Sequence, residues 1–400
     1  MTYDFTIIGA GIIGLSTAYK LSMAYPDAHI LILEKEDRVA AHQTGHNSGV
    51  IHSGIYYKPN SYRAKNCVNG RHQLVDFCKE HDVVHEICGK VIVATEEEQL
   101  NRLDEIFETG TVNEIEGIKK ISPEELKEIE PYATGFKAIH VPCTGIVDFV
   151  GVCKKLLDLV QQKNGCIKFS QKVNRIKSTG NTITITTGKD QFSTKYVINC
   201  AGLYSDHVAE SAGVETELQI VPFRGEYYQL TSEAEHMING LIYPMPNPAF
   251  PFLGVHFTKM ALGGVECGPN AVFAFKREGY EKLSFNLEET IETVNFPGFW
   301  KLAGQHWRMG LEEYYRSFSK KAFVKDLQKM VPAIRPQHLE PAKAGVRAMA
   351  LRPNGDIVND FQFSATANEI HVLNAPSPAA TAGLAIGDEI VKQAKNNFGL

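Results

Sequence analysis

The residues with the clearest chemical pattern are three glycines, Gly9, Gly11 and Gly14, in the spacing G-x-G-x-x-G. In a dinucleotide site the first allows a tight turn, the second lets the backbone approach a pyrophosphate, and the third lets a helix pack against a strand. Glu34 follows roughly 20 residues later, where a carboxylate can accept hydrogen bonds from a ribose diol. The pattern predicts a bound dinucleotide but does not separate FAD from NAD.

Three elements must position these residues. Phe5–Ile8 is a short apolar run typical of a buried strand, Ile12–Ala24 is a predicted helix, and His29–Leu33 is a second predicted strand. The glycines fall between the first strand and the helix, so the helix N-terminus would offer its free N–H groups and positive dipole end to phosphates. This context favours a Rossmann-type unit over a glycine-rich turn without a ligand.

The next informative stretch runs from Gln43 to Tyr57 and is dense in small, polar and ring-bearing residues. A chain that follows a flat isoalloxazine and its ribityl arm needs small residues and side-chain donors, which favours FAD. The same residue types also favour turns for reasons of their own, so a simple loop stays an alternative.

Together with the glycine pattern, the segment His46–Tyr57 resembles the D-amino-acid-oxidase-like flavoproteins. Within them it most resembles the L-2-hydroxyglutarate oxidase/dehydrogenase branch, a relative of the glycerol-3-phosphate oxidases. Further blocks resemble later landmarks of the family in the same order, and the similarity covers essentially the whole chain: 142–148, 199–206, 222–228, 344–347 and 375–383. The resemblance implies FAD as the cofactor.

The resemblance also implies where FAD is held. Besides the three glycines and Glu34, the implied cofactor residues are Lys35, Thr44, Gly45, Asn47, Ser48, Gly49, Val173, Ala201, Gly202, Pro376, Ser377, Ala379, Ala380 and Thr381. Two of these places make sense from the residues alone. Ala201 and Gly202 follow a predicted strand, where open α/β sheets bind ligands. A predicted helix from Thr381 to Lys395 would direct its N-terminus at the flavin carbonyl oxygens.

The expected fold is α/β with an α+β second lobe, in which a Rossmann-type FAD-binding domain is interleaved with an antiparallel-sheet substrate domain. The FAD-binding domain is expected in three pieces, 1–85, 140–215 and 340–400, and the substrate domain in two, 86–139 and 216–339. Phe250–Phe275 is among the predicted strand-rich stretches. Leu311–Met330 reads as one helix with lysines nearby, for which a solvated basic face is favoured over a membrane surface.

Composition excludes several classes of protein. A formal net charge of -5 argues against nucleic-acid binding, and no apolar run approaches the length that spans a bilayer. The eight cysteines form no C-x-x-C pair, which predicts reduced thiols and no metal site. We expect a cytoplasmic location, and we leave peripheral contact with the inner membrane open.

Oxidation of a 2-hydroxy acid needs a carboxylate site, a base for the hydroxyl proton and a C2–H aimed at flavin N5. Arg347 is the predicted carboxylate clamp, because its planar fork matches two oxygens. His52 is the predicted base and His256 a substrate contact. The remaining substrate candidates are Ser377 and, for a distal carboxylate, Tyr57, Arg224 and Lys259.

The resemblance therefore implies oxidation of L-2-hydroxyglutarate to 2-oxoglutarate by hydride transfer from C2 to flavin N5. Oxygen or the quinone pool is the expected electron acceptor. Three alternatives stay open: an oxidase or dehydrogenase of amino acids or amines, a glycerol-phosphate-type enzyme, and a nucleotide-binding scaffold without catalysis. The sequence leaves the oligomeric state undetermined.

Overall fold

The computed structural model describes residues 2–246 and 253–400, so the first residues of the predicted strand-rich stretch Phe250–Phe275 lie outside the described residues. The chain opens with β1 (Thr2–Ile8), α1 (Ile12–Ala24) and β2 (Ile30–Leu33). β1 and β2 pair in parallel, with Phe5 opposite Ile30. The predicted strand–helix–strand unit is confirmed.

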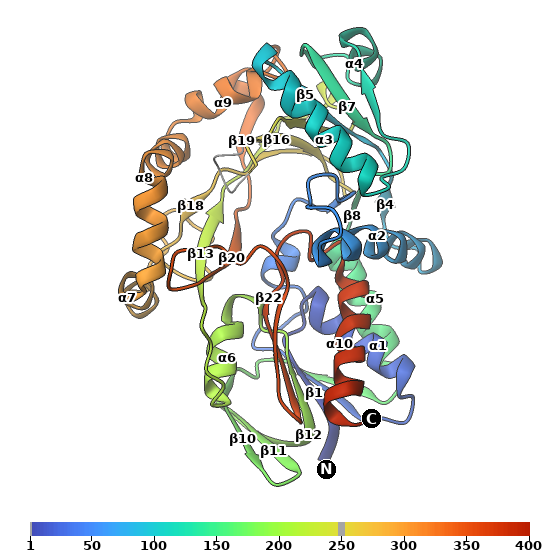
Figure 1. Cartoon of the computed structure of the whole chain (residues 1–400), viewed down its shortest axis with the longest axis vertical. Coiled ribbons are helices and arrows are strands. Elements are labelled where there is room, and N and C mark those ends of the chain that lie inside the picture. Colours follow the sequence, from blue (N-terminus) through green and yellow to red (C-terminus); the bar gives the residue numbers. More distant parts are fainter. Residues whose placement is uncertain (1, 247–252) are drawn as a thin grey trace.

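This unit lies at the centre of an eight-stranded sheet in the lower part of Figure 1. Its main path is β10 (Val173–Thr179), β11 (Thr182–Thr187), β12 (Gln191–Asn199), β1, β2 and β9 (Gly165–Lys168). β22 (Glu369–Asn374) runs parallel to β12 and carries β21 (Gln362–Ala365) as an antiparallel neighbour. The carboxyl ends of the parallel strands therefore meet at one edge, where ligands of open α/β sheets bind.

Both faces of this sheet are covered. α1 packs against α5 (Phe149–Gln161) and α10 (Gly383–Phe398), and α10 packs against α2 (Tyr62–Glu80). Alternation along β1 sends Ile7 into the core under these helices and Ile8 into a second core with residues of β10 and β11. α6 (Ser205–Ser211) packs against β10 and β22.

A second eight-stranded sheet occupies the upper part of Figure 1. Its order is β19 (Leu339–Pro341), β14 (Tyr228–Leu230), β17 (Val265–Gly268), β16 (His256–Lys259), β15 (Leu241–Pro244), β5 (Lys90–Ala94), β7 (Lys137–Val141) and β6 (Lys119–Ile121). Only the β5–β15 pair is parallel among these described strands. The predicted antiparallel character of the second lobe is confirmed.

Two small sheets lie between the large ones (Figure 1). One contains β13 (Gln219–Gly225), β18 (Val272–Phe273) and β20 (Gly345–Leu351), and the other β3 (Val50–Ile51), β8 (Gly145–Val147) and β4 (His85–Glu86). β19 and β20 pair with strands of the predicted substrate domain, although 340–400 was expected wholly in the FAD-binding domain. The division of the chain into two interleaved domains stays a prediction.

The remaining helices are α3 (Leu100–Val112), α4 (Pro123–Ile129), α7 (Leu287–Asn295), α8 (Pro297–Phe318) and α9 (Lys320–Gln328). The prediction of a single helix over Leu311–Met330 is wrong, because α8 ends before Ser319 and α9 begins after it. The Ser319 hydroxyl accepts a hydrogen bond from the Ala322 amide and so caps α9. The Ser205 hydroxyl at the start of α6 does not cap that helix but donates to the Leu373 carbonyl. Within the described ranges, no helix combines the length and apolar character needed to cross a membrane.

Candidate active site

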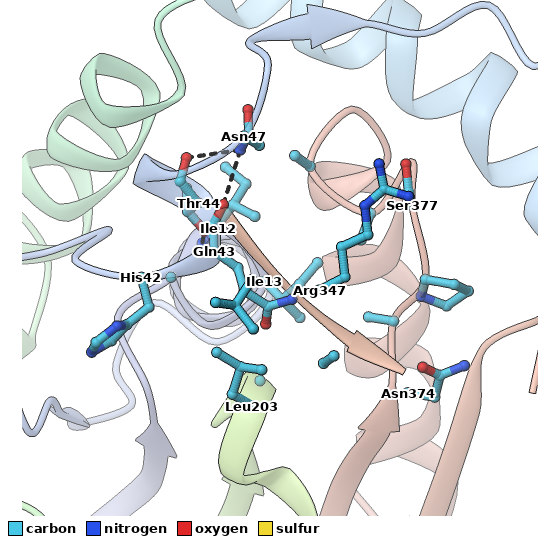
Figure 2. A pocket seen from close by; sticks show the side chains of 18 of the residues that line it. Ile12, Ile13, His42, Gln43, Thr44, Asn47, Leu203, Arg347, Asn374 and Ser377 are labelled. Carbon is cyan, nitrogen blue, oxygen red and sulfur yellow. Dashed lines mark hydrogen bonds between the residues drawn. The ribbon is translucent and has the colours of Figure 1, made fainter. Parts of the chain in front are cut away.

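One long cavity of about 950 Å³ begins where the parallel strands of the first sheet end. Ile8, Leu33, Cys200 and Leu373 line its first part, and His256 of β16 lines its far part. The volume is at the upper end of the usual range for ligand sites, roughly 300–1,000 Å³. The cavity therefore joins the βαβ unit to the second sheet, and Figure 2 shows the side chains around its middle.

The glycine loop leaves little room for side chains. Gly9 adopts a φ of +103°, and a Cβ on Gly14 would overlap the Gly9 carbonyl oxygen. A Cβ on Gly11 would lie 3.2 Å from Thr44 Oγ1, the atom that accepts a hydrogen bond from the Ile12 amide at the start of α1. Gly9 and Gly11 line the cavity whereas Gly14 does not, which matches the packing function expected of the third glycine.

Glu34 is buried at the end of β2 and lines the cavity. One carboxylate oxygen accepts a hydrogen bond from the Ala10 amide at 2.8 Å, and the other accepts one from the Glu36 amide at 2.9 Å. Each oxygen can accept a further bond. The carboxylate thus stabilises the glycine loop and can also accept a ribose hydroxyl.

Replacing Glu34 with alanine is expected to weaken FAD binding by about 1–3 kcal/mol, the scale of hydrogen bonds to a charged group. The loss combines the ribose contact with the unpaired Ala10 amide. A fluorescence titration of the apoprotein with FAD measures it. Asp37→Ala is the matched control, because this neighbouring carboxylate is largely exposed and pairs only with Arg38. Equal affinity of the Glu34 and Asp37 variants would contradict the ribose assignment.

The loop that follows is held by its own side chains. The Asn47 side-chain nitrogen donates to the carbonyls of Gln43 and Thr44 (Figure 2). Its side-chain oxygen accepts from the Gly49 backbone amide. Thr44, Asn47 and Ser48 line the cavity. Gly45 and Gly49 do not: Gly45 lies against the Ala40 carbonyl, and Gly49 has a φ of +65°. These two glycines shape the loop behind the residues that face the cavity.

Lys35, a predicted cofactor residue, lines the cavity, but its ammonium is already paired. It lies 2.7 Å from Glu36 and 2.6 Å from Glu278, and His42 bonds to the same two carboxylates. The hydrogen bonds from Lys35 and His42 lower the pKa of Glu36 to about 2. The cluster joins the end of the βαβ unit to the segment that contains Glu278. Lys35 balances the negative charge of the Glu36 and Glu278 carboxylates.

The remaining predicted cofactor residues lie on the same cavity: Val173, Ala201, Gly202, Pro376, Ser377, Ala379, Ala380 and Thr381. The Thr381 hydroxyl donates to the Val50 carbonyl and accepts from the His52 amide, both at 3.1 Å. This pair of bonds fixes the loop before α10 against β3. α10 itself begins at Gly383, two residues later than predicted.

The substrate candidates divide into two groups. His52, Tyr57, His256, Arg347 and Ser377 line the cavity, and Figure 2 shows the Arg347 side chain extending toward Ser377. The other two candidates, Arg224 and Lys259, form ion pairs with other residues.

Arg224 and Lys259 do not line the cavity. The buried Arg224 guanidinium donates to one Glu226 carboxylate oxygen and to the Glu281 carbonyl. The Lys259 ammonium lies 2.8 Å from both carboxylate oxygens of Glu86. Because ion pairs occupy both cations, we do not assign them to a distal carboxylate, which corrects the expectation from sequence.

Both candidate histidines are neutral at physiological pH. Burial lowers the pKa of His52 to about 3, and the charges of Lys90, His256, Arg63 and Arg347 lower it further. Burial likewise lowers the pKa of His256 to about 3. His256 Nδ1 lies 2.8 Å from the Gly254 carbonyl oxygen, to which it must donate, so Nε2 of the neutral ring carries the free lone pair.

Sequence reasoning missed several residues at this end of the cavity. Tyr56, Arg63, Tyr227 and Tyr243 also line it. The acids among its described lining residues are Glu34 and Glu278, both at the end where Lys35 lies. The end with the two neutral histidines therefore carries positive charge from Arg63 and Arg347 and contains no described carboxylate, which suits an anionic substrate.

The comparisons with known proteins agree with this geometry. The family model described as FAD dependent oxidoreductase matches residues 4–393. L-2-hydroxyglutarate dehydrogenase of Indibacter alkaliphilus is 49% identical over 399 residues, covering 100% of each chain. The mitochondrial L-2-hydroxyglutarate dehydrogenase of Dictyostelium discoideum is 44% identical over 415 residues, covering 99% of this chain and 93% of its own.

Among solved structures, L-alpha-glycerophosphate oxidase from Mycoplasma pneumoniae with FAD bound superposes with a TM-score of 0.81. It is 24% identical and the match covers 98% of this chain and 94% of that one, so it supports the fold alone. The glycine loop, the buried Glu34 carboxylate and the long cavity fit a dinucleotide such as FAD. The family model spans nearly the whole sequence, and the chain belongs to the FAD-dependent oxidoreductase family.

Proposed function

We propose that the protein oxidises L-2-hydroxyglutarate to 2-oxoglutarate, with FAD, when bound, supplying N5 as the acceptor of the C2 hydride. The observation that carries the proposal is the cationic end of the cavity, where the described lining residues include Arg63 and Arg347 beside the two histidines and no carboxylate. Relatives that are 44–49% identical over nearly their full length bear the name L-2-hydroxyglutarate dehydrogenase. A dianion is the substrate class that such a surface favours.

In this proposal Arg347 binds the C1 carboxylate through two parallel hydrogen bonds. Its place on β20 and its direction toward Ser377 support a fixed position for that carboxylate (Figure 2). A fixed carboxylate orients C2 and its hydrogen with respect to the reacting partner.

His52 accepts the hydroxyl proton in this proposal, and His256 contacts the substrate. The pKa of free His52 is lowered partly by cationic neighbours, so an anion bound among them would raise its proton affinity in the complex. Substrate binding would therefore raise the pKa of His52 and make it a stronger base. His256, with Nε2 unprotonated, is the competing base.

Anaerobic reduction of the flavin tests the proposed function. The purified holoprotein is mixed with L-2-hydroxyglutarate, its D-enantiomer, glycine or glycerol 3-phosphate, and the flavin absorbance is followed. Bleaching by L-2-hydroxyglutarate alone is the expected result. Faster bleaching by glycine or glycerol 3-phosphate would transfer the activity to one of the other substrate classes.

We propose oxygen or the quinone pool as the electron acceptor, and peripheral contact of a cytoplasmic protein with a membrane. Trp307, Leu311, Tyr315 and Phe318 are exposed and share one face of α8, an arrangement typical of interfacial helices. Exposed lysines of α9 lie near in sequence and would attract anionic lipids.

Sedimentation with anionic phospholipid vesicles tests this contact. The double variant Trp307→Ser/Leu311→Ser is expected to lose most of the bound fraction, because the buried apolar area drives interfacial binding. Val112→Ser is the control, since it removes an exposed apolar side chain from α3. Equal sedimentation of the double variant and the wild type would exclude this face of α8 as the membrane contact.

Reoxidation of the reduced flavin by air or by a soluble quinone identifies the electron acceptor.

A further inference from the structure

Lys90 is a buried lysine that the described residues provide with no ion pair. It belongs to β5 in the middle of the second sheet, and it is 2% exposed. Its ammonium lies 4.8 Å from the ring centroid of Tyr56 and 5.0 Å from that of Tyr243. Apart from these two aromatic faces, the described residues give its ammonium no hydrogen bond or ion pair.

A buried cation without an anion is costly. Contact with an aromatic face recovers only part of the free energy lost when an ammonium leaves water. Burial accordingly lowers the pKa of Lys90 to about 8, so the side chain still carries its proton at neutral pH. A positive charge is maintained inside the protein at this position, and its natural complement is an anion that is not part of the chain.

The rings that contact Lys90 form part of the wall of the cavity. Tyr56 and Tyr243 both line it, and the Tyr243 ring lies 4.0 Å from the ring of His256, centroid to centroid. The Tyr56 hydroxyl is buried and has no hydrogen-bond partner in the described part of the chain. A donor without a partner and a charge without a counter-ion therefore lie together beside the proposed substrate site.

We infer that Lys90 and the Tyr56 hydroxyl form the subsite for the second carboxylate of the substrate, an inference that rests on the proposed function. Tyr56 donates a hydrogen bond to that carboxylate, and Lys90 balances its charge from behind the ring. Arg347 takes the first carboxylate. Arg224 and Lys259 are unavailable because Glu226 and Glu86 pair with them. Lys90 is thus a specificity-determining residue that selects a diacid over a monoacid of equal length.

The test compares L-2-hydroxyglutarate with L-2-hydroxypentanoate, which has the same carbon chain and lacks the second carboxylate. The preference is the ratio of kcat/KM for the two acids. Lys90→Met is expected to lower this ratio roughly 100-fold, because it leaves a buried carboxylate without its counter-charge. Tyr56→Phe is expected to lower it roughly 10-fold, because it removes one hydrogen bond to a charged group. The loss should fall on the diacid, with the monoacid unchanged or improved.

Lys120→Met is the matched control. Lys120 lies on β6 of the same sheet and also faces an aromatic ring, that of Phe107, but Asp104 pairs with it. FAD content and melting temperature verify that each variant is folded, and Tyr56→Phe carries the test if Lys90→Met does not fold.

The outcomes separate the inference from the proposed function. If the wild type is not reduced by L-2-hydroxyglutarate, the proposed function fails and the subsite with it. If the wild type is reduced and both variants keep its preference, only the subsite is wrong. An equal loss for both acids would assign Lys90 a structural role and would also overturn the inference.

Discussion

Arg347→Lys is expected to lower kcat/KM for L-2-hydroxyglutarate roughly 10- to 100-fold, which corresponds to about 1.5–3 kcal/mol for a charged hydrogen bond. An ammonium keeps the charge but cannot reproduce two parallel bonds to one carboxylate. Because the clamp also orients C2, KM should rise and kcat should fall together. Steady-state kinetics with the diacid, at equal FAD content, measures both.

Arg352→Lys is the control for this variant, because Arg352 follows β20 directly and does not line the cavity. Arg347→Met should lose more than Arg347→Lys, since it removes the charge as well as the planar fork. A variant that changes KM alone would show that Arg347 contributes affinity without positioning. Unchanged kinetics in both variants would remove Arg347 from the substrate site.

The cofactor half of the cavity could be predicted from sequence because its determinants are local. The glycine spacing, the apolar runs on either side and Glu34 lie within one strand–helix–strand unit, and each follows from backbone sterics or from burial. Thr44 and Thr381, both predicted cofactor residues, line the cavity, but their hydrogen bonds could not be predicted from the sequence. Thr44 caps α1, and Thr381 connects the loop before α10 with β3, contacts that join residues far apart in the chain.

The substrate half was harder to predict because long-range pairs decide which charges are free. Lys259 belongs to the second large sheet and is neutralised by Glu86 of the small sheet formed by β3, β8 and β4. No local pattern in the sequence shows this pairing. Lys90 begins an otherwise apolar strand, and a lysine there would normally be exposed at a strand end. Only the order of the second sheet, with β5 between β15 and β7, shows that it is buried.

His52→Ala is expected to retain FAD and to slow reduction of the flavin by roughly 10²- to 10⁴-fold, the usual contribution of a general base. Stopped-flow mixing with L-2-hydroxyglutarate under anaerobic conditions measures this step separately from reoxidation. His85→Ala is the control, because Nδ1 of His85 donates to the nearby Val83 carbonyl and His85 does not line the cavity.

The pH dependence gives an independent check on the base. Since the pKa of free His52 is lowered to about 3, its proton-accepting form persists above that value and is lost only as the pH falls toward it. The wild-type kcat/KM should therefore show no loss from His52 protonation between pH 8 and pH 5, where an unperturbed histidine would already be largely protonated. His256 has the same lowered pKa, so the pH profile cannot separate the two rings, and only their alanine variants can.

Slow reduction in His256→Ala with a normal rate in His52→Ala would exchange the two roles, as the free lone pair on His256 Nε2 permits. If both variants reduce the flavin at the wild-type rate, the base is a different group and the proton-transfer step as proposed is wrong.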